Sequence, residues 1–188
     1  MKIGILALQG DFNKHAQAVK KLGHTSICLK DKEALLTCEK LIIPGGESTT
    51  IIRLIEKLNL RSALMEFAEE RSLMGTCAGL IILGNNSTGL PFPSLELIDV
   101  EIIRNAYGRQ IDSFIDTVQL DLAGEKAEFE GVFIRAPKIT RLGLDVKLLG
   151  YLGKNVVLAA NKNILVSTFH PELTEDLKIH DFFINSMS

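Results

Sequence analysis

Cys77 has the neighbours that a catalytic thiol needs. It lies in the segment GTCAG at residues 75–79, between a predicted strand and a predicted helix. This arrangement is typical of a nucleophile elbow, a tight turn that presents the central side chain at the carboxyl edge of a sheet. Small residues on either side are needed because the strand and helix backbones pass close together there. The positive end of the helix dipole also favours a negatively charged sulfur.

The alternative for Cys77 is a buried structural thiol, since free cysteine is among the most buried residue types. The symmetric small residues and the strand–helix context favour catalysis instead. Cys28 and Cys38 lack this context, and we expect them to be structural. Three widely spaced cysteines argue against a disulfide framework or a zinc site. A reducing, cytoplasmic compartment is therefore the simplest expectation.

A nucleophilic cysteine needs a base or an ion-pair partner. His170 ends an apolar predicted strand at residues 164–169, so it should face the same sheet edge as Cys77. Glu172 follows two residues later and could hold the second imidazole nitrogen in one tautomer. Alone, this segment could be a polar turn that ends a strand; together with the elbow it predicts a Cys–His–Glu triad. The other histidines, which we expect on the surface, are His15, His24 and His180.

The segment PGGES at residues 44–48 also ends a predicted strand and leads into a helix. Glycine lets backbone N–H groups approach a ligand without obstruction by a side chain. Such groups could stabilise the oxyanion of a tetrahedral intermediate. An ordinary turn with Ser48 as the helix N-cap is the alternative, and both interpretations can hold together.

Strands and helices alternate through the first half of the sequence. The predicted strands are residues 2–8, 25–29, 41–43 and 73–76, and the predicted helices are residues 13–22, 48–58, 60–70 and 78–83. Short continuous apolar runs are typical of strands buried on both faces. Their alternation with helices implies a parallel sheet that is covered by helices on both faces.

The second half is rich in strands. Six are predicted, at residues 100–103, 114–122, 132–134, 146–149, 156–160 and 164–169, before a closing helix at residues 176–187. Because little helix separates them, some should form antiparallel hairpins or a side sheet. The length of 188 residues suits a single domain, residues 1–188. We predict a flavodoxin-like three-layer α/β/α domain with a mixed, mostly parallel sheet.

The composition is that of an average soluble globular protein, with 46% hydrophobic and 23% charged residues. The formal net charge of −2 gives no electrostatic reason to expect nucleic acid or an anionic membrane as a partner. No apolar run reaches the length of a membrane span. The apolar N-terminal stretch predicts a buried first strand and not a signal peptide.

Taken together, these motifs resemble the triad-type (class I) glutamine amidotransferases, and most closely the glutaminase subunits of pyridoxal 5′-phosphate synthases. The matching segments are LQG at 8–10, PGGESTT at 44–50, GTCAGLI at 75–81, RNAYGRQ at 104–110, FIRAP at 133–137 and HPELT at 170–174. They cover nearly the whole chain. The segments that begin near Arg104 and Arg135 are specific to this subfamily, whereas the elbow is shared more widely. Residues 84–97 match none of these motifs.

The resemblance implies L-glutamine as the substrate. The residues that would contact it are Gly46, Glu47, Ser48, Arg104, Ile134 and Arg135. Arginine suits an α-carboxylate; the alternatives are a surface salt bridge for Arg104 and Arg109, and a buried strand for residues 133–134. The implied chemistry is a γ-glutamyl thioester on Cys77, with the backbone N–H groups of Gly46 and Ala78 at the oxyanion. No metal or organic cofactor is needed.

A partner that receives the ammonia directly is also expected, because free ammonia would be mostly protonated and lost at neutral pH. By resemblance it is the synthase subunit that builds pyridoxal 5′-phosphate from a pentose phosphate and a triose phosphate. Three alternatives stay open. One is a cysteine peptidase or deglycase-like enzyme, although these usually carry a histidine where Ala78 stands. The others are a glutaminase that serves histidine or purine synthesis, and a non-catalytic binding subunit.

Overall fold

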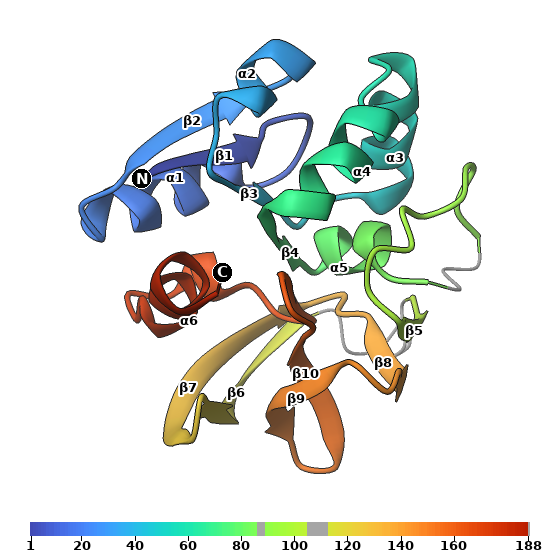
Figure 1. Ribbon diagram of the computed structural model, residues 1–188. Helices are drawn as coiled ribbons and strands as arrows, with labels where there is room; N and C mark the ends of the chain where they lie inside the picture. The colour runs from blue at the N-terminus through green and yellow to red at the C-terminus, as the bar shows by residue number, and fades with distance from the viewer. Residues whose placement is uncertain (86–88, 105–112, 188) are drawn as a thin grey trace.

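The computed structural model describes residues 1–85, 89–104 and 113–187, which contain a nine-stranded mixed sheet (Figure 1). Its parallel strands are β1 (Lys2–Leu6), β2 (Thr25–Leu29), β3 (Lys40–Ile43), β4 (Ser72–Thr76) and β11 (Ile164–Ser167). Its antiparallel strands are β6 (Ser113–Leu122), β7 (Glu125–Ile134), β9 (Lys147–Leu152) and β10 (Asn155–Ala160). The strand order is β2-β1-β3-β4-β11-β10-β9-β6-β7. The parallel half thus has the flavodoxin-like order.

Helices cover both faces of the parallel half (Figure 1). One face carries α1 (Phe12–Lys21) and α6 (Lys178–Asp181), which continues into a π-helical turn (Phe182–Ser186). The other face carries α2 (Lys32–Leu36), α3 (Ser48–Lys57), α4 (Arg61–Glu70) and α5 (Ala78–Leu83). Two apolar cores fill the spaces between the layers, one on each side of the sheet. The predicted three-layer α/β/α fold is confirmed.

The strands themselves explain why both faces are covered. All residues of β3 and β4 are buried, as a strand between two helical layers requires. Ile42 and Met74 belong to the core beneath α1 and α6, whereas Leu41, Ile43 and Leu73 belong to the core beneath α3, α4 and α5. Successive side chains point to opposite faces of a strand, so one apolar run supplies both cores.

The strand-rich half also has the predicted hairpins and side sheet. β6 and β7 form a ten-residue antiparallel hairpin, and β5 (Val100–Ile103) pairs with β8 (Lys138–Leu142) in a separate two-stranded sheet. Neither β8 nor the short α2 was predicted, and β7 was predicted only at residues 132–134. The first half of β7 alternates exposed charged residues with buried ones, because its outer face meets solvent. Among the described residues, no helix is long and apolar enough to cross a membrane.

Candidate active site

The predicted site residues meet at the carboxyl edge of the parallel strands, around a cavity of about 250 Å³. Its lining is Gln9, Gly46, Glu47, Ser48, Cys77, Ile81, Arg104, Ile134, Arg135 and His170. All the residues predicted to contact glutamine are therefore there, together with the predicted nucleophile and base. The size lies just below the range of about 300–1,000 Å³ for ligand pockets in general, which suits an amino acid. Two lining residues that we did not assign to the site are Gln9 and Ile81.

Cys77 sits on a strained turn between β4 and α5. Its backbone has φ 50° and ψ −98°, a conformation that non-glycine residues rarely adopt. The flanking glycines make the turn possible. A Cβ on Gly79 would lie 2.1 Å from the carbonyl oxygen of Ile43, and one on Gly75 would lie 2.7 Å from the carbonyl carbon of Gly79. The predicted close approach of strand and helix is confirmed.

The predicted base and orienter form a buried pair beside this turn. His170 Nδ1 lies 2.8 Å from Glu172 Oε1, and both side chains are almost inaccessible to solvent. Burial lowers the pKa of His170, but its contacts with Cys77 and Glu172 together raise that pKa to about 10. Burial raises the pKa of Glu172, but the nearby His15 and His170 lower it to about 2. At neutral pH the pair is an imidazolium and a carboxylate.

These shifts predict how the free energy of unfolding depends on pH. The folded pKa of His170, about 10, lies above the unfolded value of about 6.5. Its stabilising contribution should be complete below pH about 6.5 and lost as the pH rises through about 10. Urea denaturation over this range should show a decline in wild-type stability that is much smaller in His170→Asn. Parallel curves for the two proteins would contradict the raised pKa.

The loop after β3 is anchored on both sides of Gly46. The N–H of Gly45 donates to Thr76 Oγ1 at 3.0 Å, and the N–H of Glu47 donates to Gln9 Oε1 at 2.6 Å. Gly46 itself has φ +154° and is exposed. A Cβ on Gly10 would lie 1.8 Å from the carbonyl oxygen of Gly45, so the chain after β1 packs directly on this loop. The residues on both sides of Gly46 are thus anchored at the cavity wall.

A second backbone donor is close to Cys77. Ala78 is the first residue of α5, so its N–H belongs to the helix-terminal donors that lack an intrahelical acceptor. The Cys77 sulfur also lies 3.8 Å from the carbonyl oxygen of Ile134. Residue 134 is partly exposed and lines the cavity, whereas the preceding Phe133 is fully buried. The strand end therefore supplies both a core residue and a cavity residue.

The N-cap of α3 is Glu47, so the alternative interpretation, with Ser48 as the cap, is wrong. The two carboxylate oxygens of Glu47 accept from the backbone N–H groups and the hydroxyls of Thr49 and Thr50. These hydrogen bonds, led by those from the two hydroxyls, lower the pKa of Glu47 to about 2. A carboxylate has about four lone-pair positions, and this cap uses all of them. Glu47 lines the cavity, but its carboxylate stabilises the helix.

Two arginines border the cavity. The Nη1 atom of Arg104 donates to the carbonyl oxygen of Gly89 at 2.8 Å. Arg135 lines the cavity directly after β7 and has a positive φ of 42°, which is uncommon for a non-glycine residue. The rest of the motif RNAYGRQ, including Arg109, lies outside the described residues.

The prediction that His15 and His180 lie on the surface is wrong. Both are completely buried behind Glu172, while His24 is half-buried. His15 is followed at the next helical turn by Ala18 and Val19, which are also buried. This spacing puts the histidine on the apolar face of α1 and is the signal that could have located it.

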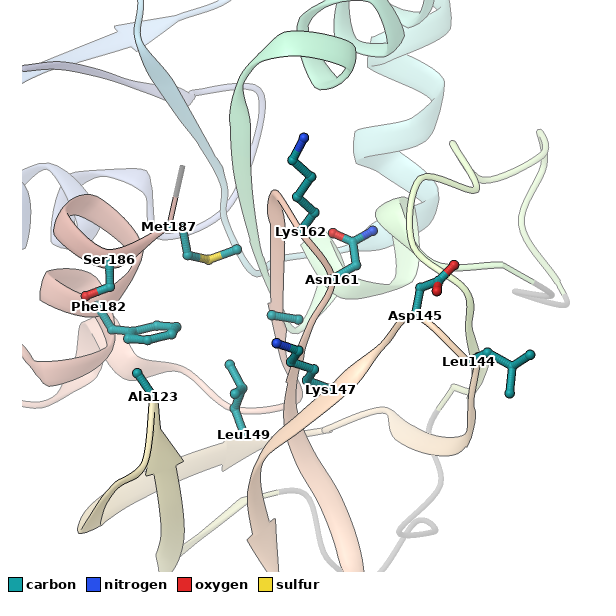
Figure 2. Close-up of a pocket in the computed structure, with 11 residues that line it drawn as sticks. Ala123, Leu144, Asp145, Lys147, Leu149, Asn161, Lys162, Phe182, Ser186 and Met187 are labelled. Carbon is teal, nitrogen blue, oxygen red and sulfur yellow. The ribbon is translucent and has the colours of Figure 1, made fainter.

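A larger cavity, of about 820 Å³, lies at the opposite edge of the sheet (Figure 2). Phe182 and Met187 of the C-terminal segment face Lys147 and Leu149 across it. It is bordered by the turns that precede β9 and β11, whereas Cys77 and His170 follow the other ends of their strands. None of the predicted site residues lines it, and its described lining has no cysteine or histidine. Size alone therefore does not identify the active site.

Comparison with known proteins shows what the chain as a whole is similar to. The model of the SNO glutamine amidotransferase family matches residues 5–188. The pyridoxal 5′-phosphate synthase subunit PdxT of Fervidobacterium nodosum is 43% identical over 185 residues, which span 98% of this chain and 96% of that protein. The same subunit of Thermosipho africanus is 43% identical over 98% of both chains.

Solved structures agree as well. A crystal structure described as a glutamine amidotransferase matches 97% of this chain and 96% of its own, with 41% identity and a TM-score of 0.90. The PurLQS structure from Thermotoga maritima shares the fold, with a TM-score of 0.70 and 16% identity over 98% of this chain and 97% of that one.

Proposed function

This chain belongs to the SNO glutamine amidotransferase family, and from that premise we propose that it is the glutaminase subunit of a pyridoxal 5′-phosphate synthase. The proposed chemistry rests on one observation. Cys77 and His170 line one cavity together with two arginines, and Glu172 contacts the Nδ1 atom of His170. The relatives named as PdxT support the biosynthetic assignment, since they match nearly the whole chain. We treat residues 1–188 as a single glutaminase domain.

The first half of the reaction forms a thioester. The thiolate of Cys77 attacks the carboxamide carbon of L-glutamine, and the carbonyl oxygen becomes an oxyanion. The backbone N–H groups of Gly46 and Ala78 stabilise that oxyanion. His170 then donates its Nε2 proton to the nitrogen as the C–N bond breaks, so ammonia leaves and a γ-glutamyl thioester remains. Because its pKa is raised, His170 is protonated at neutral pH and can donate this proton.

The second half releases glutamate. Neutral His170 takes a proton from water, and the resulting hydroxide attacks the thioester carbon. The C–S bond breaks, glutamate leaves, and the thiolate and imidazolium are restored. Glu172 stays ionised throughout and stabilises the imidazolium through the 2.8 Å contact. His170 thus returns, with the proton from water, to the state in which it began the cycle.

The amino-acid end of the substrate meets the polar side of the cavity. Arg104 and Arg135 suit the α-carboxylate, because a guanidinium presents paired donors. Ser48 and the carbonyl oxygen of Ile134 are available for the amino group. Since the carboxylate of Glu47 is used by the helix cap, we assign this residue to shaping the cavity.

A peptidase or deglycase-like activity fits less well. The family match covers residues 5–188, and Ala78 stands where those enzymes usually carry a histidine. The full-length PdxT relatives also disfavour a glutaminase for histidine or purine synthesis. A non-catalytic subunit is disfavoured because the Cys–His–Glu set is complete.

We expect the synthase subunit to activate this glutaminase. The Gly46 peptide can rotate at low cost, because glycine tolerates φ of either sign. Its neighbours are held by Gln9 and Gly10, which follow β1 at the same sheet edge and offer a partner a direct route to the loop. Misaiming one oxyanion donor costs about 10²–10³ in rate. Binding of the partner should therefore raise the rate by about that factor.

The test is to titrate the synthase subunit into a fixed amount of this protein and to follow glutamate release, with an unrelated protein of equal concentration as the control. A rate that is maximal without the partner would show that the oxyanion site is already formed. If no glutamate appears even with the synthase subunit present, the proposed function itself is wrong.

A further inference from the structure

Two buried histidines extend the triad beyond Glu172. His15 on α1 has its Nε2 atom 3.3 Å from Glu172 Oε2, the oxygen that does not contact His170. On its other side, His15 Nδ1 lies 2.9 Å from Nε2 of His180 on α6. Both histidines have no solvent exposure. A continuous line of polar contacts therefore runs from the reacting thiol into the layer formed by α1 and α6.

Both histidines are neutral. Burial lowers the pKa of His15, and the influence of His170 adds to this, against the opposite effects of Glu172 and Asp11. Burial likewise lowers the pKa of His180, to about 3, with a further contribution from His15 and an opposing one from Glu172. Each ring therefore carries one proton, and the direction of each hydrogen bond depends on the tautomer.

The carboxylate selects the tautomer. An ionised Glu172 can only accept, so the facing Nε2 of His15 must carry the proton for this contact to be favourable. His15 Nδ1 is then an acceptor, which requires Nε2 of His180 to be its donor. This leaves Nδ1 of His180 unprotonated, and that buried atom has no hydrogen-bond partner in the described structure. Glu172 Oε2 is also buried without a standard hydrogen bond, so the N–H of His15, 3.3 Å away, is the donor that faces it. The opposite pair of tautomers would set two acceptors against each other and bury an unpaired N–H.

We propose that His15 is a positioning residue of the glutaminase: its Nε2–H holds the outer oxygen of Glu172, and His180 fixes the tautomer that makes this possible. The inference rests on the proposed function for its catalytic consequence. With His170 on one carboxylate oxygen and His15 Nε2 at 3.3 Å from the other, rotation of the carboxylate would separate both pairs, so Glu172 Oε1 stays directed at His170 Nδ1.

The same imidazole also reaches the oxyanion loop. His15 Nε2 lies 3.3 Å from Thr76 Oγ1, and that hydroxyl accepts the N–H of Gly45. Thr76 directly precedes the nucleophile. One histidine therefore contacts both the acidic end of the triad and the residue that anchors the loop before Gly46. Losing it should affect the chemical step more than substrate binding, because His15 does not line the cavity.

The kinetic test compares three variants in the complex with the synthase subunit. His15→Leu removes the donor, while His15→Gln keeps an amide N–H at a similar reach. Val19→Ala, on the same buried face of α1, is the packing control. Losing an outer hydrogen-bond partner costs about 10–100-fold at metal sites, and we expect kcat to fall by that order in His15→Leu with KM nearly unchanged. His15→Gln should recover most of the loss, and Val19→Ala should keep the wild-type kcat.

Three kinetic results would contradict the proposal. A kcat for His15→Leu close to that of the wild type would overturn the proposal, as would an equal loss in Val19→Ala or a failure of His15→Gln to recover activity. A second measurement does not need an active or mutated enzyme: nitrogen-15 NMR of the wild-type histidines reports which ring nitrogen is protonated. We expect His15 and His180 to be Nε2–H tautomers at neutral pH, and an Nδ1–H tautomer of His15 would refute the arrangement. A wild type without glutaminase activity would refute the proposed function, while the NMR result would still decide the hydrogen-bond arrangement.

Discussion

Replacing Cys77 by alanine should abolish glutamine hydrolysis while leaving the protein folded. In a hydrolytic triad, loss of the nucleophile costs about 10⁶ in kcat. The side chain is small and buried at the end of a strained turn, and alanine can take the same backbone path. Glutamate release, measured with the synthase subunit present, should fall to the background rate, and the circular dichroism spectrum should not change.

Two other cysteines provide matched controls. Cys28 is exposed on β2, and Cys38 is buried in the core on the α3–α4 side of the sheet. We expect Cys28→Ser and Cys38→Ala to keep the wild-type kcat per folded molecule. An electrophilic glutamine analogue should label the wild type at Cys77 and fail to label the Cys77→Ala variant. Substantial hydrolysis by Cys77→Ala would remove this residue from the mechanism.

The sequence was sufficient to predict the elbow because its chemistry is local. A nucleophile at a strand–helix turn requires small neighbours, and the contacts at Gly75 and Gly79 give the reason: added side-chain atoms would overlap backbone. His170 could be assigned to the same edge because parallel strands β4 and β11 end together. Patterns that depend on backbone geometry alone can thus be read from one sequence.

The supporting contacts could not be predicted in this way. Glu47 replaces Ser48 as the cap of α3, because its longer side chain folds back onto the hydroxyls and N–H groups of Thr49 and Thr50. His15 and His180 are 165 residues apart, and only the packing of α1 beside α6 brings their rings together. A polar residue on a helix is normally expected to be exposed to solvent. Its burial is favourable only when it has hydrogen-bond partners, and the sequence alone does not identify those partners.

The outer strands were less predictable for a related reason. In β7, charged residues alternate with buried ones, so residues 125–131 lack a continuous apolar run. The strand is fixed by its ten-residue pairing with β6, a long-range property of the hairpin. Half-exposed hairpins therefore give a weaker local signal than the fully buried strands beside them.

Glu172→Gln should keep glutamine binding but slow turnover by up to about 10⁴, the cost of neutralising the acidic member in a comparable triad. The amide can still accept from His170 Nδ1, but it no longer offers a negative charge to the imidazolium. The contact with Cys77 still raises the pKa of His170, but the contribution of the Glu172 charge is lost, so that pKa falls from its value of about 10. Activity should therefore be lost at a lower pH in the variant than in the wild type as the pH rises, because His170 must be protonated to release ammonia.

The structure adds a second reason for a large effect. If the amide oxygen takes the place of Glu172 Oε1, its NH₂ group faces Nε2–H of His15, and two donors oppose each other. Relief requires a change of tautomer at His15 and His180, which buries an unpaired N–H at His180 Nδ1. Glu175→Gln makes the same chemical change three residues later, on an exposed side chain paired with Lys21, and should leave turnover unaltered. The measurement is saturation kinetics of both variants with the synthase subunit present. Turnover of Glu172→Gln equal to that of Glu175→Gln would show that the charge of Glu172 has no part in catalysis.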